Sequence, residues 1–244
     1  MYIRLPLPFF IYTMSSKEHY NHVAQHPPVM CTALRSAHRQ AKRALLCHAV
    51  QQACGEISAA HIVDFACGRG GDMVKCVGCA SYVGVDTADQ ALVELQRRAL
   101  QVGIRATTYC MDAADMPDHA CNIAMCNFAL HYFCDARAHM CRLLDKVRTC
   151  LMPNGVFCGT YQRWPGGNDV HWGEAYHAVV GDCVNAVEYK VPWHVIVKYA
   201  AKSGLAVICH APLQALHCES DQSIWFFIMR LSSPSQHYGT SATA

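Results

Sequence analysis

Apolar segments with strand periodicity alternate with segments of helical periodicity from about residue 33 onward, and this alternation limits the possible fold most. The predicted strands are short, nearly continuous apolar runs over 61–65, 81–85, 107–110, 122–127, 156–161, 205–210 and 223–230. Helical spacing predicts helices over 33–52, 88–102, 136–151 and 193–202. Asp135 is expected to cap the third of these helices. The pattern is typical of a parallel, doubly wound α/β sheet, with two late strands forming an antiparallel pair at one edge.

The length of the chain predicts one domain with two loose ends. The 244 residues, 52% of them hydrophobic, can bury a single large core. We expect this domain over residues 19–230, a disordered extension over 1–18 and a loose tail over 231–244. The apolar start Met1–Tyr12 contains Pro6 and Pro8 and is too short to span a bilayer. We therefore expect a soluble, intracellular protein with no membrane contact.

Charge is balanced overall but unevenly distributed along the chain. The formal net charge of +2 indicates no general affinity for nucleic acid. Residues 1–60 nevertheless hold six Lys or Arg against two Asp or Glu, whereas residues 61–120 hold five against eight. A basic front followed by an acidic middle suits a site that binds a polyanion on one side and a cation on the other.

The sixteen cysteines resemble buried apolar residues more than ligands or disulfide partners. They are scattered through apolar runs, and Cys76-Val-Gly-Cys79 is the one C-x-x-C pair. No second pair stands at zinc-finger spacing, and the fifteen histidines form no H-E-x-x-H motif. We assign no metal and expect a reducing compartment.

The segment Val63–Asp72 reads Val-Asp-Phe-Ala-Cys-Gly-Arg-Gly-Gly-Asp and follows the first predicted strand. Its glycines predict a turn into a further helix, and small residues there let the backbone approach a ligand closely. The segment matches neither G-x-G-x-x-G nor the triphosphate-binding G-x-x-x-x-G-K-[ST] pattern. The sequence therefore predicts a ligand-binding loop of another type.

Two acids at the ends of the following strands narrow the class of ligand that this loop can bind. Asp86 ends the second strand, where a carboxylate can bind both hydroxyls of a ribose, although it could also simply cap the next helix. Asp112 follows the third strand and is placed to accept from an adenine amino group. One loop and two acids resemble S-adenosylmethionine-dependent methyltransferases more than dehydrogenases.

A further set of motifs is similar to the mRNA cap (guanine-N7) methyltransferases. It comprises His19-Tyr-Asn21, Gly68-Arg-Gly-Gly-Asp72, Cys126–Cys134 with His131-Tyr132, Glu188-Tyr-Lys-Val191 and Ser223-Ile-Trp225. These motifs occur in the family's order and cover about residues 19–230. The resemblance implies a Rossmann-like class I methyltransferase fold, with a mostly parallel seven-stranded sheet and helices on both faces. It also implies S-adenosylmethionine as cofactor, the capped 5′ end of mRNA as substrate, and other capping enzymes as partners.

The resemblance also assigns residues to the cofactor and to the cap. Together with the loop, it assigns the cofactor to Lys42, Asp64, Ala66, Gly68, Asp72, Asp86, Asp112, Asn127 and Tyr132. It assigns the cap phosphates to Arg69, Lys75 and Arg98, and the guanine pocket to His131, Glu188 and Trp225. Ala66 stands where the family has glycine, Asn127 where it has glutamine, Arg69 where it has lysine, and Trp225 where it has tyrosine.

The chemistry of guanine N7 explains why no general base is predicted. N7 has a free lone pair and no proton, so it can attack the sulfonium methyl group directly. Catalysis then depends on proximity, orientation and a favourable field, with His131, Tyr132 and Glu188 as positioning residues. A carboxylate at Glu188 can accept from guanine N1–H and the 2-amino group, and Tyr132, Tyr189 or Trp225 can stack on the base.

Two alternatives remain open from the sequence. The first is a methyltransferase of the same fold that acts on another RNA position or on a small molecule; it needs Asp86 and the glycine loop but not Glu188. The second is a non-catalytic capping subunit, although Asp86 and the uncharged glycine turn argue against loss of the cofactor site.

Overall fold

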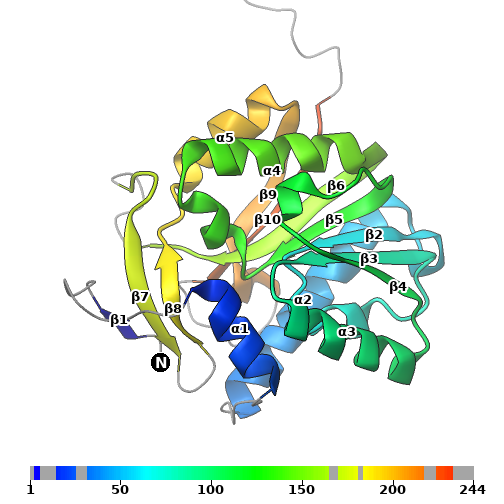
Figure 1. Cartoon of the computed structure of the whole chain (residues 1–244). Helices are drawn as coiled ribbons and strands as arrows, with labels where there is room; N and C mark the ends of the chain where they lie inside the picture. The colour runs from blue at the N-terminus through cyan, green and yellow to red at the C-terminus, as the bar shows by residue number, and fades with distance from the viewer. Residues whose placement is uncertain are drawn as a thin grey trace, which may run out of the picture.

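The seven-stranded sheet at the centre of the molecule confirms the predicted architecture (Figure 1). The computed structural model describes residues 3–5, 15–25, 32–164, 170–180, 184–216 and 224–232. The strands are β2 (His61–Phe65), β3 (Ser81–Asp86), β4 (Ala106–Cys110), β5 (Cys121–Asn127), β6 (Leu151–Gln162), β9 (Leu205–Pro212) and β10 (Ile224–Leu231). Their order across the sheet is β4-β3-β2-β5-β6-β10-β9. Strands β2 to β6 are parallel to one another, and β10 runs antiparallel to both β6 and β9, as predicted for the edge.

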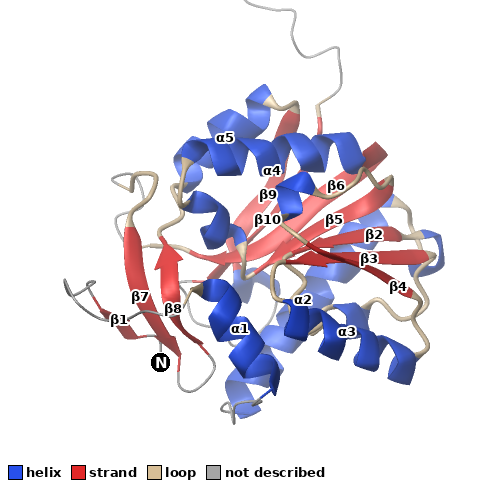
Figure 2. Cartoon of the chain, viewed as in Figure 1, coloured by secondary structure: helices blue, strands red, loops and turns tan. Residues whose placement is uncertain are grey.

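Helices cover both faces of this sheet, which gives the domain two apolar cores (Figure 2). One face packs against α2 (Thr32–Ala53) and α3 (Asp89–Val102), and the other against α4 (Arg137–Cys150) and α5 (Trp193–Lys202). The apolar residues of α4 share one buried face, namely Met140, Leu143, Leu144, Val147 and Cys150. This burial is the physical basis of the helical spacing in the sequence.

A second, small antiparallel sheet was not predicted. It has the order β1-β7-β8, with β1 (Ile3–Leu5), β7 (Ala175–Val180) and β8 (Val184–Tyr189). Beside it lies α1 (Ser16–Gln25), which contacts both β8 and α3 (Figure 1). Residues 3–5 and 16–18, which fall within the disordered extension predicted over 1–18, form β1, paired with β7, and the start of α1.

The other end of the predicted domain is only partly described. Leu231 ends β10 rather than beginning a tail, and Ser232 donates its backbone N–H to Gly204 O at 2.7 Å. Residues 233–244, the rest of the predicted tail, lie outside the described residues. Within the described ranges, no helix combines the length and the apolar character needed to cross a membrane.

Two local predictions need correction. The glycine turn is followed only by one turn of 3-10 helix, η2 (Met73–Lys75), because Gly70 and Gly78 have φ of +70° and +88° and leave no room for a longer helix. Asp135 is not the N-cap of α4, since the 3-10 helix η4 (Leu130–Cys134) runs up to it and Ala136 takes the cap position. Asp135 Oδ1 instead accepts from the Ala136 N–H at 2.7 Å.

Candidate functional site

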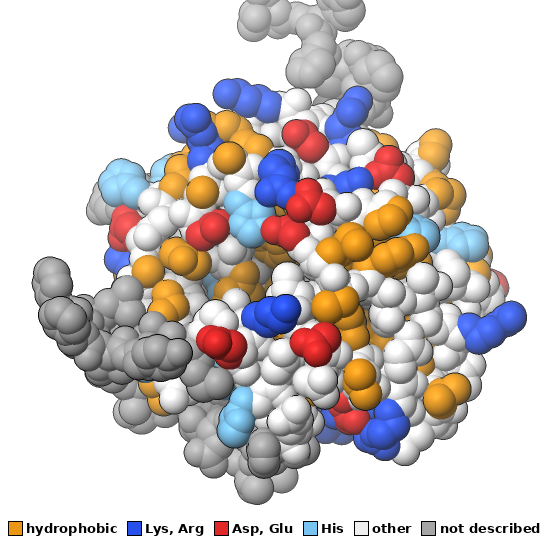
Figure 3. Space-filling view, in the orientation of Figure 1, with side chains coloured by type: hydrophobic (Ala, Val, Ile, Leu, Met, Phe, Trp, Pro, Cys, Tyr) orange, Lys and Arg blue, Asp and Glu red, His pale blue; other side chains and the backbone are white. Residues whose placement is uncertain are grey.

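A cavity of about 850 Å³ lies at the carboxyl ends of β2, β3, β4 and β5. In the space-filling view this face is hollowed near its middle, with acidic and basic side chains around the hollow (Figure 3). All nine residues predicted for the cofactor line the cavity: Lys42, Asp64, Ala66, Gly68, Asp72, Asp86, Asp112, Asn127 and Tyr132. They meet because the carboxyl ends of parallel strands lie at one edge of a sheet.

Asp86 holds the glycine loop against β3. Its Oδ2 accepts from the Gly68 N–H at 2.8 Å, and its Oδ1 accepts from the Ala88 N–H at 2.9 Å. Asp86 therefore supports the start of α3 and the loop at once, while its side chain still lines the cavity. Burial raises the pKa of Asp86, and the backbone N–H groups partly oppose this shift.

The glycine loop leaves open space on its cavity side. A Cβ atom built on Gly68 or Gly71 meets no other atom within 4 Å. Ala66 has φ of +60°, a left-handed conformation in which the family's glycine carries less strain. The loop can thus bring its backbone close to a ligand, as small residues at this position predict.

A buried charge network forms the floor beside the loop. Asp72 accepts from Lys42 Nζ at 2.9 Å and from Lys75 Nζ at 2.6 Å, and Asp64 Oδ2 accepts from the Tyr82 hydroxyl at 2.6 Å. Burial and the nearby Asp72 charge raise the pKa of Asp64 to about 7. Burial acts in the same direction on Asp72, but the two ammonium groups outweigh it and lower the pKa of Asp72.

None of the three predicted phosphate contacts lines the cavity. The Lys75 side chain is only 8% exposed, and its Nζ donates to Asp72 and to Gly71 O. Arg69 donates from Nη1 to Val23 O in the last turn of α1 at 2.8 Å, and Arg98 pairs with Glu94 on α3 at 2.7 Å. Each of the three cations therefore has a partner within the protein, and their assignment to the cap phosphates stays a prediction.

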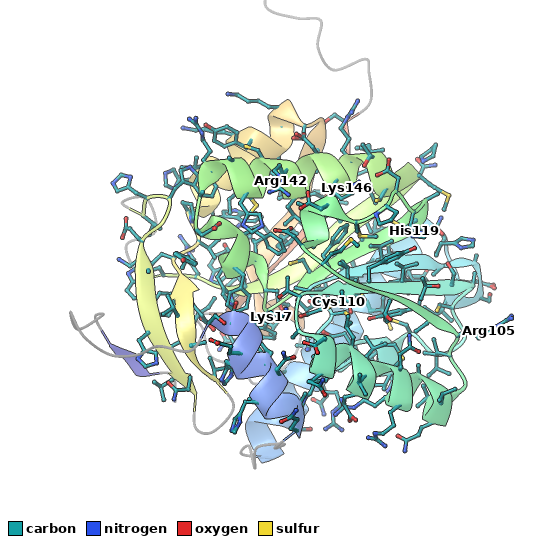
Figure 4. All side chains as sticks on the ribbon, viewed as in Figure 1. Lys17, Arg105, Cys110, His119, Arg142 and Lys146 are labelled. Atoms are coloured by element: carbon teal, nitrogen blue, oxygen red, sulfur yellow. The ribbon has the colours of Figure 1, made fainter. Side chains whose placement is uncertain are left out.

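Lys17, which the sequence reasoning missed, is the exposed cation among the lining residues. It lies in the first turn of α1, and Figure 4 shows it near the middle of the face. The only signal for it in the sequence is the basic character of the first sixty residues.

His131 and Glu188 come together directly behind the cavity wall. His131 Nε2 lies 3.4 Å from Glu188 Oε1, at ion-pair distance but without hydrogen-bond geometry, and the Tyr176 hydroxyl donates to Glu188 Oε2 at 2.7 Å. Burial lowers the pKa of His131, and the Glu188 charge opposes this shift. The residues that do line the cavity are their chain neighbours, Tyr132 beside His131 and Val187 and Tyr189 beside Glu188.

A second histidine, also missed from the sequence, bridges two acids of the lining. His139 Nε2 lies 3.0 Å from Asp112 Oδ2, and His139 Nδ1 lies 2.8 Å from Asp135 Oδ1. Asp112 Oδ1 accepts from the Ala114 N–H at 2.8 Å, whereas the contact of Asp112 Oδ2 with His139 Nε2 lacks hydrogen-bond geometry. The spacing of Asp135 and His139, four residues apart at the start of a helix, was the available signal.

Trp225, predicted for the guanine pocket, lies outside the cavity lining. Its ring lies between the ring of His210, at a centroid distance of 4.6 Å, and the guanidinium of Arg163, 4.3 Å from its centroid. Ser223 of the same predicted motif lies outside the described residues. The apolar part of the lining comes instead from Met111, Phe128, Phe133 and Tyr189.

Curated proteins similar to this chain are mRNA cap methyltransferases. The mRNA cap guanine-N(7) methyltransferase 1 of Oryza sativa is 27% identical over a match that covers 60% of this chain and 53% of the relative. The protein of the same name from Arabidopsis thaliana is 29% identical, covering 41% of this chain and 32% of the relative. The chain thus spans about half the length of the rice relative, and less of the other.

Solved structures with a similar fold are S-adenosylmethionine-dependent methyltransferases. One from Clostridium acetobutylicum has a TM-score of 0.63 at 12% identity, covering 88% of this chain and 96% of that one. Magnesium protoporphyrin IX methyltransferase from Synechocystis, solved with bound SAM, also has a TM-score of 0.63 at 12% identity, covering 90% and 93%. These similarities show that the fold is the Rossmann-like class I methyltransferase fold.

The family assignment comes from the sequence itself. Residues 14–165 match the model of the mRNA (guanine-N(7))-methyltransferase domain. The match contains the glycine loop, Asp86, Asp112 and the His131-Tyr132 segment, which together surround the cavity or form its wall. This chain therefore belongs to the mRNA (guanine-N(7))-methyltransferase domain family.

Proposed function

We propose that this protein transfers a methyl group from S-adenosylmethionine to guanine N7 of the 5′ cap of mRNA. The observation that carries the proposal is the cavity: all nine cofactor residues line it, and the His131–Glu188 pair lies directly behind its wall. The similarity to the mRNA cap guanine-N(7) methyltransferases of rice and Arabidopsis thaliana supports the same activity.

Each part of the cofactor has a matching group in the lining. Asp86 would accept from the ribose hydroxyls, and Asp112, which accepts from the Ala114 N–H, would accept from the adenine amino group. Lys42 would pair with the carboxylate of the cofactor, and Asp64 lies on the same floor to face its ammonium group. When bound, the cofactor supplies an electrophilic methyl group on a sulfonium.

The guanine would be recognised at the His131–Glu188 pair. The Tyr176 hydroxyl already donates to Glu188 Oε2, whereas Glu188 Oε1 lies 3.4 Å from the poorly aligned His131 Nε2. Guanine N1–H and its amino group would compete with His131 for this oxygen. A buried carboxylate near the base also favours the cation that forms when N7 gains the methyl group.

The rest of the mechanism is positioning. N7 needs no deprotonation, so His131 and Tyr132 would act by shape and contact rather than as acid or base. The Tyr132 hydroxyl is 3.0 Å from the Tyr20 hydroxyl of α1, which fixes the ring at the cavity wall. Lys17, which lines the cavity, is a further candidate for the cap phosphates besides Arg69, Lys75 and Arg98.

A methylation assay with four RNA acceptors tests the proposal. The chain is incubated with radiolabelled S-adenosylmethionine and a short RNA that carries GpppG, m7GpppG, a 5′ triphosphate or a 5′ hydroxyl. Label is expected only on the GpppG RNA, because m7GpppG has its N7 blocked. Equal labelling of the GpppG and m7GpppG RNAs would instead assign the methyl group to another RNA position, and no labelling of any RNA would favour a small-molecule acceptor or a non-catalytic subunit.

We also propose a reducing compartment and an association with other capping enzymes. The described cysteines are all free, and burial raises the pKa of several of them, for instance Cys67 and Cys134, which suits thiols that stay reduced. Co-purification of the tagged chain with an RNA triphosphatase or a guanylyltransferase from its own cells tests the association.

A further inference from the structure

Four aromatic rings and one guanidinium form a connected aromatic cluster beside the proposed cap site. Its members are Tyr161, Trp193, His210, Trp225 and Arg163. The Trp193 ring centroid lies 5.2 Å from that of Tyr161 and 4.3 Å from that of His210, and the Tyr161 and His210 centroids are 6.0 Å apart, so these three rings form a compact group. The Trp225 centroid lies 4.6 Å from that of His210, and the guanidinium carbon of Arg163 lies 4.3 Å from the Trp225 ring centre. Four elements contribute to it: β6 and its end, α5, β9 and β10.

The aromatic cluster is buried at Tyr161 and exposed at Arg163. Tyr161 is fully buried, and its hydroxyl lies 2.8 Å from His210 Nε2. The rings of Tyr161, Trp193 and His210 lie within 24° of parallel to one another. Arg163 is exposed, and its guanidinium lies over the Trp225 ring. Burial and the Arg163 charge lower the pKa of His210 to about 4, so its ring is neutral at pH 7.

The aromatic cluster is adjacent to the cavity. Asn127, which lines the cavity, accepts from the Thr160 hydroxyl at 3.3 Å, and Arg163 follows Thr160 by three residues. Three extended residues span at most about 11 Å. The outer face of Arg163 is therefore within reach of the first nucleotides that leave a cap bound in the cavity.

Arg163 differs from the other cation that covers a tryptophan at this edge. Lys190 lies 4.5 Å from the Trp164 ring centre, but it is also paired with Glu174 at 2.7 Å. For Arg163, no ion pair with a carboxylate is found within the described part of the chain. Only the Arg163 end thus combines a planar surface with a charge that can attract phosphate.

We propose that the Arg163–Trp225 end of the aromatic cluster binds single-stranded RNA, namely the nucleotides that follow the cap. A base would stack on the guanidinium plane, as bases do on arginine and aromatic side chains, and the positive charge would attract the adjacent phosphate. This places Trp225 after the cap rather than around the guanine. The inference rests on the proposed function for the identity of the RNA, but not for the binding itself.

Binding of an uncapped oligonucleotide separates this inference from the methyl transfer. A fluorescein-labelled ten-nucleotide oligouridine is titrated with the full chain at low salt, and the anisotropy gives Kd. Arg163→Ala is expected to raise Kd about tenfold, the scale of one lost stacked base. Arg163→Lys keeps the charge but not the plane, so it is expected to raise Kd nearly as much.

Arg105→Ala is the matched control. Arg105 is also exposed, but it precedes β4 at the opposite edge of the sheet, far from Lys17 in Figure 4. This variant should bind the oligouridine within twofold of wild type. The inference is overturned if wild type does not bind the oligonucleotide, if Arg163→Ala binds like wild type, or if Arg105→Ala weakens binding equally.

Methylation of the GpppG dinucleotide, which has no RNA body, reports on the proposed function separately. If wild type methylates the dinucleotide but Arg163→Ala binds RNA normally, only the RNA surface is wrong. If wild type binds the oligonucleotide through Arg163 but methylates no cap, the surface stands and the proposed function fails.

Discussion

His131 Nε2 lies 3.4 Å from Glu188 Oε1, and the two residues are 6% and 4% exposed. The contact joins the segment after β5 to the small sheet, two parts of the chain more than fifty residues apart. Because burial lowers the pKa of His131, the carboxylate faces a neutral ring at pH 7 rather than a fixed cation. A guanine edge can therefore compete with the neutral His131 ring for Glu188 Oε1.

Glu188→Gln should lower kcat/KM for capped RNA by roughly 2–4 kcal/mol, the range for a lost charged contact in a water-poor site. The variant keeps the shape but loses the charge that favours the methylated guanine. Affinity for S-adenosylhomocysteine should stay near wild type, because Glu188 does not line the cofactor cavity. Calorimetric titrations with cap analogue and with S-adenosylhomocysteine accompany the kinetics. Unchanged turnover of capped RNA, or an equal loss of affinity for the cap analogue and for S-adenosylhomocysteine, would show that Glu188 has only a structural role.

Asp86→Ala should weaken binding of S-adenosylhomocysteine by about 2 kcal/mol, the scale of a charged hydrogen-bonded contact. The variant also leaves the Gly68 and Ala88 N–H groups without their acceptor, so part of the loss will come from the loop. Calorimetry gives the affinity, and circular dichroism checks that the variant is folded. Asp115→Ala, an exposed acid outside the cavity lining, is the control. A folded Asp86→Ala protein with wild-type affinity would exclude the ribose contact.

Asp64 should make the stability of the free protein fall between about pH 4 and pH 7. Its native pKa of about 7 is raised above the unfolded value of about 3.9, so the native state holds more protons than the unfolded state in this window. The contribution of Asp64 to the free energy of unfolding is complete below its unfolded pKa and is lost as the pH rises through its native pKa. Asp64→Asn cannot ionise and should flatten this part of the profile, measured by urea unfolding at each pH. Identical profiles for the two proteins would contradict the raised pKa.

Lys17→Ala should raise KM for capped RNA about fivefold, roughly 1 kcal/mol for an exposed charge contact. The dependence of KM on salt should become shallower, because one phosphate contact is removed. Arg98→Ala is the matched control, since Arg98 pairs with Glu94 outside the cavity. If Arg98→Ala has the larger effect on KM, the phosphates run along α3 instead.

Ala66→Gly should stabilise the protein by about 0.5–1 kcal/mol. The left-handed backbone at φ +60° costs an alanine about 1–2 kcal/mol, of which the greater unfolded freedom of glycine cancels part. Urea unfolding measures the change. Ala49→Gly, a fully buried position inside α2, should instead destabilise the protein. A loss of stability in both variants would show that the Ala66 methyl group packs more favourably than its conformation costs.

The sequence by itself determined the central sheet and the residues of the cofactor cavity. Strand and helix periodicities are local, and each cofactor residue follows the end of a strand or lies in a motif that can be identified without distant contacts. Asp86 and Asp112 are examples: once β3 and β4 are parallel, their ends must lie at the same edge of the sheet.

Only the tertiary structure decided where the remaining side chains go. Arg69 binds Val23 O, forty-six residues earlier, and Lys75 pairs with Asp72, although charge and motif had placed both on phosphate. The sheet of β1, β7 and β8 likewise needs strands from both ends of the chain. The partner of a flexible cation depends on which distant groups are buried beside it, and no local periodicity encodes that burial.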